Sequence, residues 1–214
     1  MPTSDSETGC ESVRPTAEPS LILASRSPRR SQLLERAGVR FEVLPADIVE
    51  ERRADESAES FVERMACEKA LVIASGLPAE SDRWVLGADT VVVLGEAVLG
   101  KPRDSVHAIE MLTQLAGRVH RVVTGVAVVS GGAATRHILH VETLVEMRDV
   151  ERKEIEEYVA TQEPLDKAGA YALQGEGRNL VHRVSGSETN VIGLPMEATL
   201  DLLGRIGVEE TFHL

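Results

Sequence analysis

The sequence lacks several features that would place it in common functional classes. Aromatic residues make up only 3% of the 214 residues, so a folded core must be built mainly from aliphatic side chains. Acidic residues outnumber basic ones, and the formal net charge is -12. General attraction to nucleic acids or anionic lipids needs a basic face, so both classes of partner are disfavoured. A polyanionic ligand would need a local cluster of cations.

Cysteines and long apolar runs are also scarce. The two cysteines, Cys10 and Cys67, form neither a disulfide framework nor a zinc-binding spacing, which favours a reducing compartment. No stretch approaches the roughly 18 apolar residues of a membrane span. Asp5, Glu7 and Glu11 stand where a signal peptide would be basic and then apolar. We therefore expect a cytoplasmic protein with no membrane partner.

Three familiar motifs are missing from the sequence as well. There is no GxxxxGK[ST] phosphate loop, no GxGxxG after a strand and no GxSxG nucleophile elbow. These absences disfavour P-loop, dinucleotide-binding and α/β-hydrolase interpretations. His137 and His140 lie three residues apart in an expected strand, which places them on opposite faces, so a shared metal is not expected.

The N-terminal part of the chain divides into a tail and the start of a domain. Residues 1–19 are rich in Ser, Thr, Glu and Pro and hold few large apolar groups, so we expect a disordered tail. Residues 20–214 are expected to form a single domain. It begins with a buried strand at 21–24 and a helix that Ser27 caps and Gly38 ends.

The rest of the chain alternates apolar runs with turn signals. This pattern predicts a strand at 41–45, a long helix at 57–76, a central strand at 84–94 that turns at Gly95-Glu96 into 98–99, a helix from Asp104 or Ser105 to Gly117, a long hairpin of 121–129 and 135–147, a short helix opened by Asp149, short strands at 170–173 and 180–184, and a last helix after Pro195. The mixture favours an α/β fold with a mixed, twisted sheet flanked by helices.

The junction between the first strand and the first helix is a candidate anion site. The free N–H groups and positive end of a helix bind anions, and Arg29 and Arg30 add two guanidiniums there. The hydroxyls of Ser25 and Ser27 can complete a phosphate cradle. Two alternatives stay open for this segment: a capped helix with two solvated arginines, and a phosphorylated Ser-Pro site.

Asp89 lies in the middle of a nearly continuous apolar strand. An unpaired buried carboxylate carries a large desolvation cost, so Asp89 needs a cation, hydrogen-bond donors or a metal. A hard carboxylate is the ligand type that Mg²⁺ or Mn²⁺ prefers, and Glu50, after the second strand, can supply another. The alternatives are an aspartate turned outward or paired with a core arginine, and a glutamate that is only a loop acid.

Two lysines and a glutamine complete the candidate site. Lys101 stands between Gly100 and Pro102, which fix backbone direction, and Lys69 lies in the long helix. Either can contact a phosphate, although single lysines are more often solvated surface groups. Gln174 carries both a donor and an acceptor and can read the edge of a nucleobase.

Taken together and in order, these segments resemble the Maf family. The resemblance spans about residues 21–205 and is carried by the segments LASRSPRR at 23–30, GADTVV at 87–92, GKP at 100–102, EPLDKAGAY at 163–171, Gln174-Gly175 and NVIGLP at 190–195. It implies an α/β fold similar to inosine triphosphate pyrophosphatases, with two lobes around a cleft. It also implies hydrolysis of a nucleoside triphosphate to the monophosphate and pyrophosphate.

The resemblance also implies roles for particular residues. Asp89 would be the proton acceptor, and Arg29, Thr90 and Gln174 would govern the choice of base. Glu50, Lys69 and Lys101 match polar residues around the family's phosphate site. The Pro28-Arg29-Arg30 pattern, Thr90, Asp166-Lys167 and Gln174 look like the branch that acts on dTTP and UTP. A homodimer is also suggested.

The expected chemistry agrees with these roles. A triphosphate carries about four negative charges that repel an attacking water unless they are neutralised. Arg29, Arg30, Lys69, Lys101 and a divalent cation, Mg²⁺ or Mn²⁺, can neutralise them while Asp89 activates the water and Glu50 helps hold the ion. The main alternative function is a nucleotide-binding regulator of cell division or septum formation that uses the same cleft; a weaker one is a nonspecific phosphatase.

Overall fold

A seven-stranded mixed sheet forms the centre of the protein. The computed structural model describes residues 20–208, and the tail predicted at 1–19 lies outside the described residues, as do 209–214. The strand order is β2-β1-β3-β5-β6-β7, and β4 pairs with β3 beside this path. The strands are β1 (Leu21–Leu23), β2 (Phe41–Val43), β3 (Trp84–Leu94), β4 (Ala97–Leu99), β5 (Val119–Ser130), β6 (Arg136–Met147) and β7 (Val181–Ser185).

The direction of the strands follows the lengths of their connections. β1 pairs in parallel with both β2 and β3, and each of these connections contains a helix. The long strands pair antiparallel with one another, β3 with β5 and β5 with β6, and a short turn joins β5 to β6. The prediction of an α/β fold with a mixed sheet flanked by helices is therefore confirmed.

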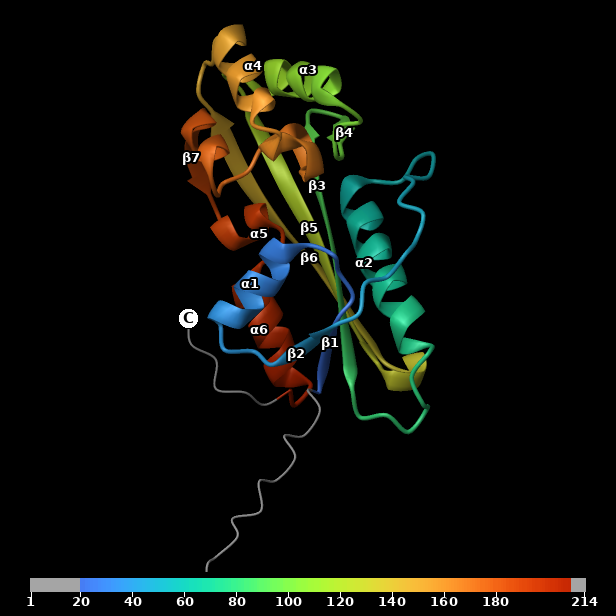
Figure 1. The fold of residues 1–214 in the computed structure, drawn as a ribbon. Coiled ribbons are helices and arrows are strands. Elements are labelled where there is room, and N and C mark those ends of the chain that lie inside the picture. Colours follow the sequence, from blue (N-terminus) through green and yellow to red (C-terminus); the bar gives the residue numbers. More distant parts are fainter. Residues whose placement is uncertain (1–19, 209–214) are drawn as a thin grey trace, which may run out of the picture.

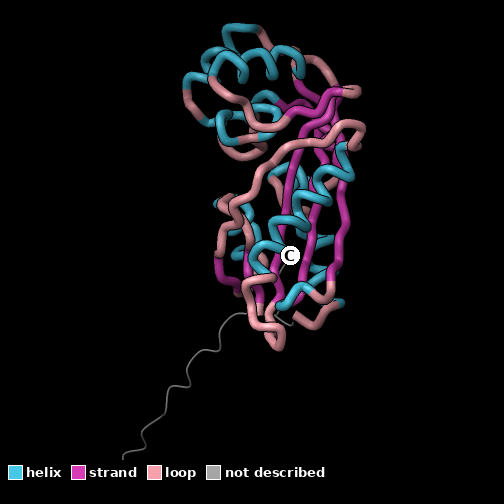
Figure 2. The backbone as a smooth tube through the Cα atoms, turned by 90° about the vertical axis from the view of Figure 1, so that its right-hand side faces the viewer, coloured by secondary structure: helices cyan, strands magenta, loops and turns pink. Residues whose placement is uncertain are grey.

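Helices cover the sheet in separate groups. They are α1 (Pro28–Arg36), α2 (Ala58–Ala74), α3 (Ser105–Leu115), α4 (Arg152–Ala160), α5 (Glu188–Ile192) and α6 (Met196–Arg205). Figure 1 shows α2 along one side of the long strands, α1 and α6 on the other, and α3 and α4 at one end. Figure 2 shows strands extending from the helices at the top of the view down along the rest of the molecule.

The alternation of side chains along the strands produces this layering. In β1, Leu21 and Leu23 pack into the core beneath α1 and α6, whereas Ile22 faces a second cluster with Ala70 of α2. A third core, at the far end of the long strands, joins α3 and α4 and includes Leu112 and Ile155. The separate cores divide the molecule into two lobes that share β3, β5 and β6.

Two glycines allow α2 to lie close against the sheet. A Cβ atom at Gly87 of β3 would stand 2.1 Å from the carbonyl oxygen of Ala66, and one at Gly125 of β5 would stand 2.3 Å from that of Val62. Any side chain at these positions would push the helix away. The close packing fixes the position of α2 relative to the middle of β3.

Most predicted elements are present, with three differences. The short helix after β6 begins at Arg152 with Glu151 at its N-cap, not at Asp149. Residues 170–173 do not form a strand, because Gly169 and Ala170 have φ values of 67° and 59° and interrupt any extended backbone. This region is instead built from the short 3-10 turns η2 (Glu163–Asp166), η3 (Ala168–Ala170) and η4 (Glu176–Leu180).

The third difference is α5, a short helix that the sequence pattern did not predict. Ser187 caps it by accepting a hydrogen bond from the backbone N–H of Asn190 at 3.2 Å. Another 3-10 turn, η1 (Gly131–Ala133), forms the tip of the predicted hairpin. Within residues 20–208, no helix is long and apolar enough to cross a membrane.

Candidate functional site

The site forms where one edge of β3 changes its neighbour. Along this edge β3 pairs with β1 as far as Leu86 and with β4 from Val92 onward. No strand of the described chain pairs with this edge between the two, at Asp89 and Thr90. Ligands of open α/β sheets bind beyond the carboxyl ends of strands at such switch points, because the backbone there is not covered by a neighbouring strand.

A cavity of about 680 Å³ opens at this position. All of the predicted site residues line it: Ser25, Arg29, Arg30, Glu50, Lys69, Asp89, Thr90, Lys101 and Gln174. Its cationic side chains, Arg26, Arg29, Arg30, Lys69, Lys101 and Lys167, outnumber its acidic ones, Asp47, Glu50, Asp89 and Asp166. The cavity thus provides the local excess of cations that an anionic ligand needs in an acidic chain.

Asp89 and Lys69 form a buried ion pair on the α2 side of β3. The Lys69 Nζ atom lies 2.6 Å from Asp89 Oδ1 and 2.7 Å from Glu50 Oε1. The side chains of Lys69 and Asp89 are each only 10% exposed, whereas that of Glu50 is 41% exposed. One ammonium therefore joins a buried carboxylate to a more solvated one.

The two carboxylates respond differently to this arrangement. Burial raises the pKa of Asp89, and the charge and hydrogen bond of Lys69 only partly oppose that rise. Burial also acts to raise the pKa of Glu50, but the hydrogen bond and charge of Lys69, with the charge of Lys101, outweigh it and lower that pKa. Burial thus makes Asp89 a stronger base than an ordinary aspartate, whereas the neighbouring cations make Glu50 a weaker base than an ordinary glutamate.

The other side of β3 presents Thr90 toward α1. Arg30 donates from Nε to the carbonyl oxygen of Gly193 at 2.7 Å, and from its two terminal nitrogens to Ser25 Oγ and Thr90 Oγ1 at 3.2 Å each. Burial lowers the pKa of Arg30, and the nearby Asp89 opposes that effect. Because its guanidinium is held by three oxygen atoms, Arg30 is fixed in position at the cavity wall.

The first helix begins as predicted, but its N-cap works differently. Pro28 occupies the first turn, and Ser27 stands at the N-cap without a side-chain capping hydrogen bond. The Ser27 backbone N–H instead donates to Ser25 Oγ at 3.1 Å. Ser25 is 6% exposed. Because its hydroxyl accepts hydrogen bonds from Ser27 and from Arg30, it links the end of β1 to the start of α1 and to Arg30.

Arg29 connects the first helix to the opposite lobe. Its guanidinium lies 3.0 Å from Asp166 Oδ2 of η2, and the Lys167 Nζ atom lies 2.6 Å from Asp166 Oδ1. Burial acts to raise the pKa of Asp166, but the hydrogen bond of Lys167 and the charge of Arg29 outweigh it and lower that pKa. The Asp166 carboxylate, held between Arg29 and Lys167, therefore joins the two sides of the cavity.

Lys101 and Gln174 have no such partners. Both line the cavity, and neither makes a hydrogen bond or ion pair with another residue of the described part of the chain. Lys101 is exposed and follows β4, while Gln174 is half-buried and precedes η4. Their polar atoms can therefore contact a ligand without first breaking a protein contact.

Sequence reasoning missed the residues that support Thr90 from behind. Thr124 of β5 is fully buried, its hydroxyl lies 2.9 Å from Thr90 Oγ1, and it donates to the carbonyl oxygen of Asn190 at 3.0 Å. Asn190 Nδ2 donates to Val122 O and Thr143 Oγ1 at 3.0 Å each. A threonine in a valine-rich strand gives no signal until the register places it opposite Thr90.

Asp89 and Glu50 suit a metal ion that is held by few protein ligands better than one that is enclosed by protein ligands alone. Within residues 20–208, no group of three or more His, Cys, Asp or Glu side chains is placed to hold a metal ion. The carboxylates of Asp89 and Glu50 nevertheless lie close together, because both pair with the Lys69 ammonium. Mg²⁺ is commonly held by one or two carboxylates and completes its coordination with water and substrate phosphates. The residues present fit that mode and do not fit an all-protein cage.

Comparison with known proteins identifies the family of this chain. Residues 20–206 match the family described as Maf-like protein. A dTTP/UTP pyrophosphatase of Myxococcus xanthus (strain DK1622) is 51% identical over 190 residues, which cover 88% of this chain and 93% of that protein. A dTTP/UTP pyrophosphatase of Alcanivorax borkumensis is 49% identical over 184 residues, covering 86% and 93%. The family match extends over nearly all of the described residues, and the chain belongs to the Maf-like protein family.

Proposed function

We propose that this chain hydrolyses nucleoside triphosphates, with dTTP and UTP as its preferred substrates, to the monophosphate and pyrophosphate. The observation that carries the proposal is the buried Asp89 carboxylate, paired with Lys69 in a cavity where cationic side chains outnumber acidic ones. A buried carboxylate beside such an excess of cations supports a role as a base next to a bound polyanion. Relatives that share about half of their aligned residues with this chain are named dTTP/UTP pyrophosphatases.

The cations bind and orient the triphosphate. Arg30 is fixed at the wall by Ser25 and Thr90, so it can offer a preorganised charge without a large loss of side-chain entropy. Lys101 makes no ion pair with the described part of the chain, so contact with a phosphate breaks none there. Lys69 can turn its ammonium from the two carboxylates toward a phosphate oxygen, which would leave Asp89 free to accept a proton.

Hydrolysis then needs a base and a leaving group. Asp89 accepts a proton from water as the water oxygen bonds to the α phosphorus, and the bond from that phosphorus to the oxygen bridging the α and β phosphates breaks. The bridging oxygen leaves with pyrophosphate. Glu50 and Asp89 would hold a divalent ion, Mg²⁺ or Mn²⁺, which when bound supplies positive charge to stabilise the phosphates.

Selectivity for the base is assigned to Arg29, Thr90 and Gln174, which line the cavity. The half-buried Gln174 has a donor and an acceptor that make no hydrogen bond within the described residues and can pair with a pyrimidine edge. Arg29 is already oriented by Asp166. The names of the relatives support dTTP and UTP and give no support to a regulator of cell division. The cytoplasmic location and the homodimer stay predictions.

A nucleotide panel tests this function. The purified chain is incubated with Mg²⁺ and each of dTTP, UTP, CTP, dATP and dGTP, and the phosphate products are identified by ion chromatography. We expect pyrophosphate and the monophosphate from dTTP and UTP at the highest kcat/KM. Release of orthophosphate, or nucleotide binding without turnover, would contradict the proposal. Omitting the metal in a parallel reaction shows whether a divalent cation is required.

A further inference from the structure

Glu50 lies in a long segment that has no regular secondary structure. Residues 44–57 connect β2 to α2, and Glu50 is the residue of this segment that contacts Lys69. Holding one side chain of such a segment at 2.7 Å from Lys69 costs conformational entropy, so other contacts must restrain the backbone. Irregular segments of this length in compact domains are commonly functional.

The backbone is restrained on both sides of Glu50. Before it, Ile48 packs on the core formed by Phe61, Val91 and neighbours beneath α2. After it, the carbonyl oxygen of Glu51 accepts a hydrogen bond from Arg64 at 3.0 Å. The apolar contact of Ile48 and the hydrogen bond from Arg64 therefore both restrain the backbone next to Glu50.

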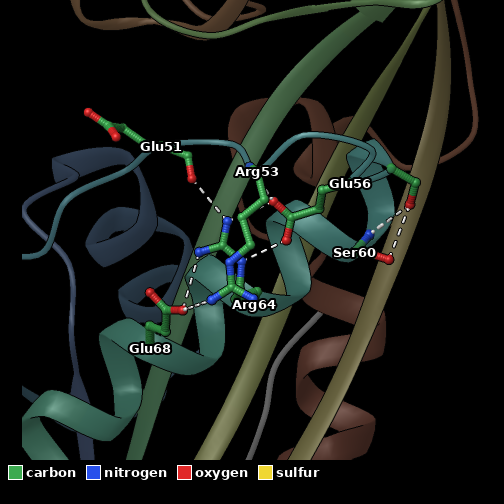
Figure 3. A network of polar contacts seen from close by, with 7 residues as sticks. Glu51, Arg53, Glu56, Ser60, Arg64 and Glu68 are labelled. Carbon is green, nitrogen blue, oxygen red and sulfur yellow. Dashed lines mark hydrogen bonds and ion pairs between the residues drawn. The ribbon is translucent and has the colours of Figure 1, made fainter.

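Arg64 is the centre of a polar network on α2 (Figure 3). Its Nε and one terminal nitrogen donate to the two oxygens of Glu56 at 2.6 and 2.7 Å, and its other terminal nitrogen donates to Glu68 at 3.2 Å. The side chains of Arg64 and Glu56 are only 17% and 9% exposed. Paired arginine–carboxylate contacts with little solvent exposure fix both partners in orientation.

The network also reaches both the segment and the cavity wall. Glu56 accepts a hydrogen bond from the backbone N–H of Arg53 at 3.1 Å within the segment, and its contacts with Arg64 join this part of the segment to α2. The Arg64 guanidinium lies 5.6 Å from the centre of the Phe61 ring, and Phe61 lines the cavity. The hydrogen bond to Arg64 lowers the pKa of Glu56 to about 2, so this pair stays charged at neutral pH.

Arg64 and Lys69 belong to the same helix. One end of α2 holds the segment through Arg64, and a later turn presents Lys69 to Glu50 and Asp89. The helix itself is fixed against the sheet at Gly87 and Gly125. A single rigid element therefore sets the distance between the base of the site and the loop carboxylate.

We propose that Arg64 is a positioning residue that holds Glu50 at the cation site by binding the Glu51 carbonyl and Glu56. The inference rests on the proposed function. Partners that orient a metal-binding carboxylate commonly change metal affinity about 10- to 100-fold when they are replaced. Arg64 does not line the cavity, so it would act on Glu50 through the segment and without contact with the ligand.

The test compares Arg64→Gln with the wild-type chain by direct binding of Mn²⁺, followed through the electron paramagnetic resonance signal of the free ion. We expect Mn²⁺ affinity to fall about 10- to 100-fold, and the amides of residues 50–52 to exchange hydrogen faster. In the Glu50→Gln background, Arg64→Gln should have little further effect on Mn²⁺ affinity, because both changes remove the same ligand.

Arg121→Gln is the matched control, because Arg121 pairs with Glu59 of α2 and with Glu142 but does not contact the segment. It should leave Mn²⁺ affinity unchanged. If Arg64→Gln does not fold, Glu56→Gln weakens the same pair and should lower affinity by a smaller factor. Unchanged affinity in a folded variant, or equal losses with and without Glu50→Gln, would overturn the proposal. Pyrophosphate release by the wild-type chain is measured separately, because its failure would refute the function and not the role of Arg64.

Discussion

Replacing Lys69 with methionine should expose the electrostatic cost of burying Asp89. At the observed separation of 2.6 Å, two unit charges attract by about 6 kcal/mol for an effective dielectric constant of 20. Arg30 still faces Asp89 after the change, and the carboxylate can take up a proton, so the net loss must be smaller. Breaking a buried pair by removing one partner costs about 3–5 kcal/mol. We expect Lys69→Met to lose about 3 kcal/mol of unfolding free energy at pH 8.

The loss should depend on pH in a defined direction. Burial already raises the pKa of Asp89, and removing Lys69 raises it further, so the folded variant holds its proton more tightly than the unfolded chain. Stability is then greatest below the unfolded pKa of about 4 and declines as pH rises through the folded pKa. Glu50 adds less to this effect, because its side chain is 41% exposed and water can solvate its charge.

Urea unfolding, followed by the fluorescence of Trp84 in β3, measures these differences. The difference in free energy of unfolding between Lys69→Met and the wild type should be smaller at pH 5 than at pH 8 by more than about 1 kcal/mol. The comparison at each pH removes the contribution of other titrating groups. Lys69→Met combined with Asp89→Asn should regain most of the lost stability, since no uncompensated charge remains. A gap that does not change with pH, or a double variant as unstable as Lys69→Met, would refute the reasoning.

Three other residues give independent predictions. Gly87→Ala should lower the free energy of unfolding by about 3 kcal/mol or more, because its Cβ would stand 2.1 Å from the Ala66 carbonyl oxygen; Gly204→Ala, where a Cβ meets nothing within 4 Å, should show no loss in the same urea titration. Thr90→Val removes a hydroxyl that accepts a hydrogen bond from Arg30, so it should lower the free energy of unfolding by about 1–3 kcal/mol and alter the kcat/KM ratio of dTTP to CTP. Unchanged stability and an unchanged ratio would contradict this. Burial lowers the pKa of His120 to about 4, so His120 alone should contribute a loss of about 3 kcal/mol of unfolding free energy as pH falls from 6.5 to 4, and the loss over this range should be smaller by about that amount in His120→Gln.

The sequence predicted the elements better than their detailed contacts. The helix opened by Pro28 and the strand containing Asp89 were predicted because helix boundaries and apolar runs are local signals. The strand expected at 170–173 was wrong, because two successive residues of positive φ, Gly169 and Ala170, replace extended backbone with 3-10 turns. An alanine with positive φ cannot be anticipated from its type, since tertiary contacts impose it.

The candidate site was predicted as a set of residues, but its arrangement was not. Asp89 was singled out because a carboxylate in an apolar run needs a partner, and the structure supplies Lys69 as that partner. Which lysine would reach it depends on the packing of α2 at Gly87, a contact between distant segments. Arg64 and Thr124 gave no local signal, because both act through pairings that exist only in the folded chain.

The role of Asp89 as the base is the central claim, and Asp89→Asn tests it most directly. The amide keeps the size of the side chain and removes its ability to accept a proton, so the fold should persist while catalysis is lost. The measurement is the rate of pyrophosphate release from dTTP with Mg²⁺, at saturating substrate and with Trp84 fluorescence confirming that the variant is folded. The account predicts a fall in kcat of at least about 100-fold. A folded Asp89→Asn that releases pyrophosphate at the wild-type rate would contradict it.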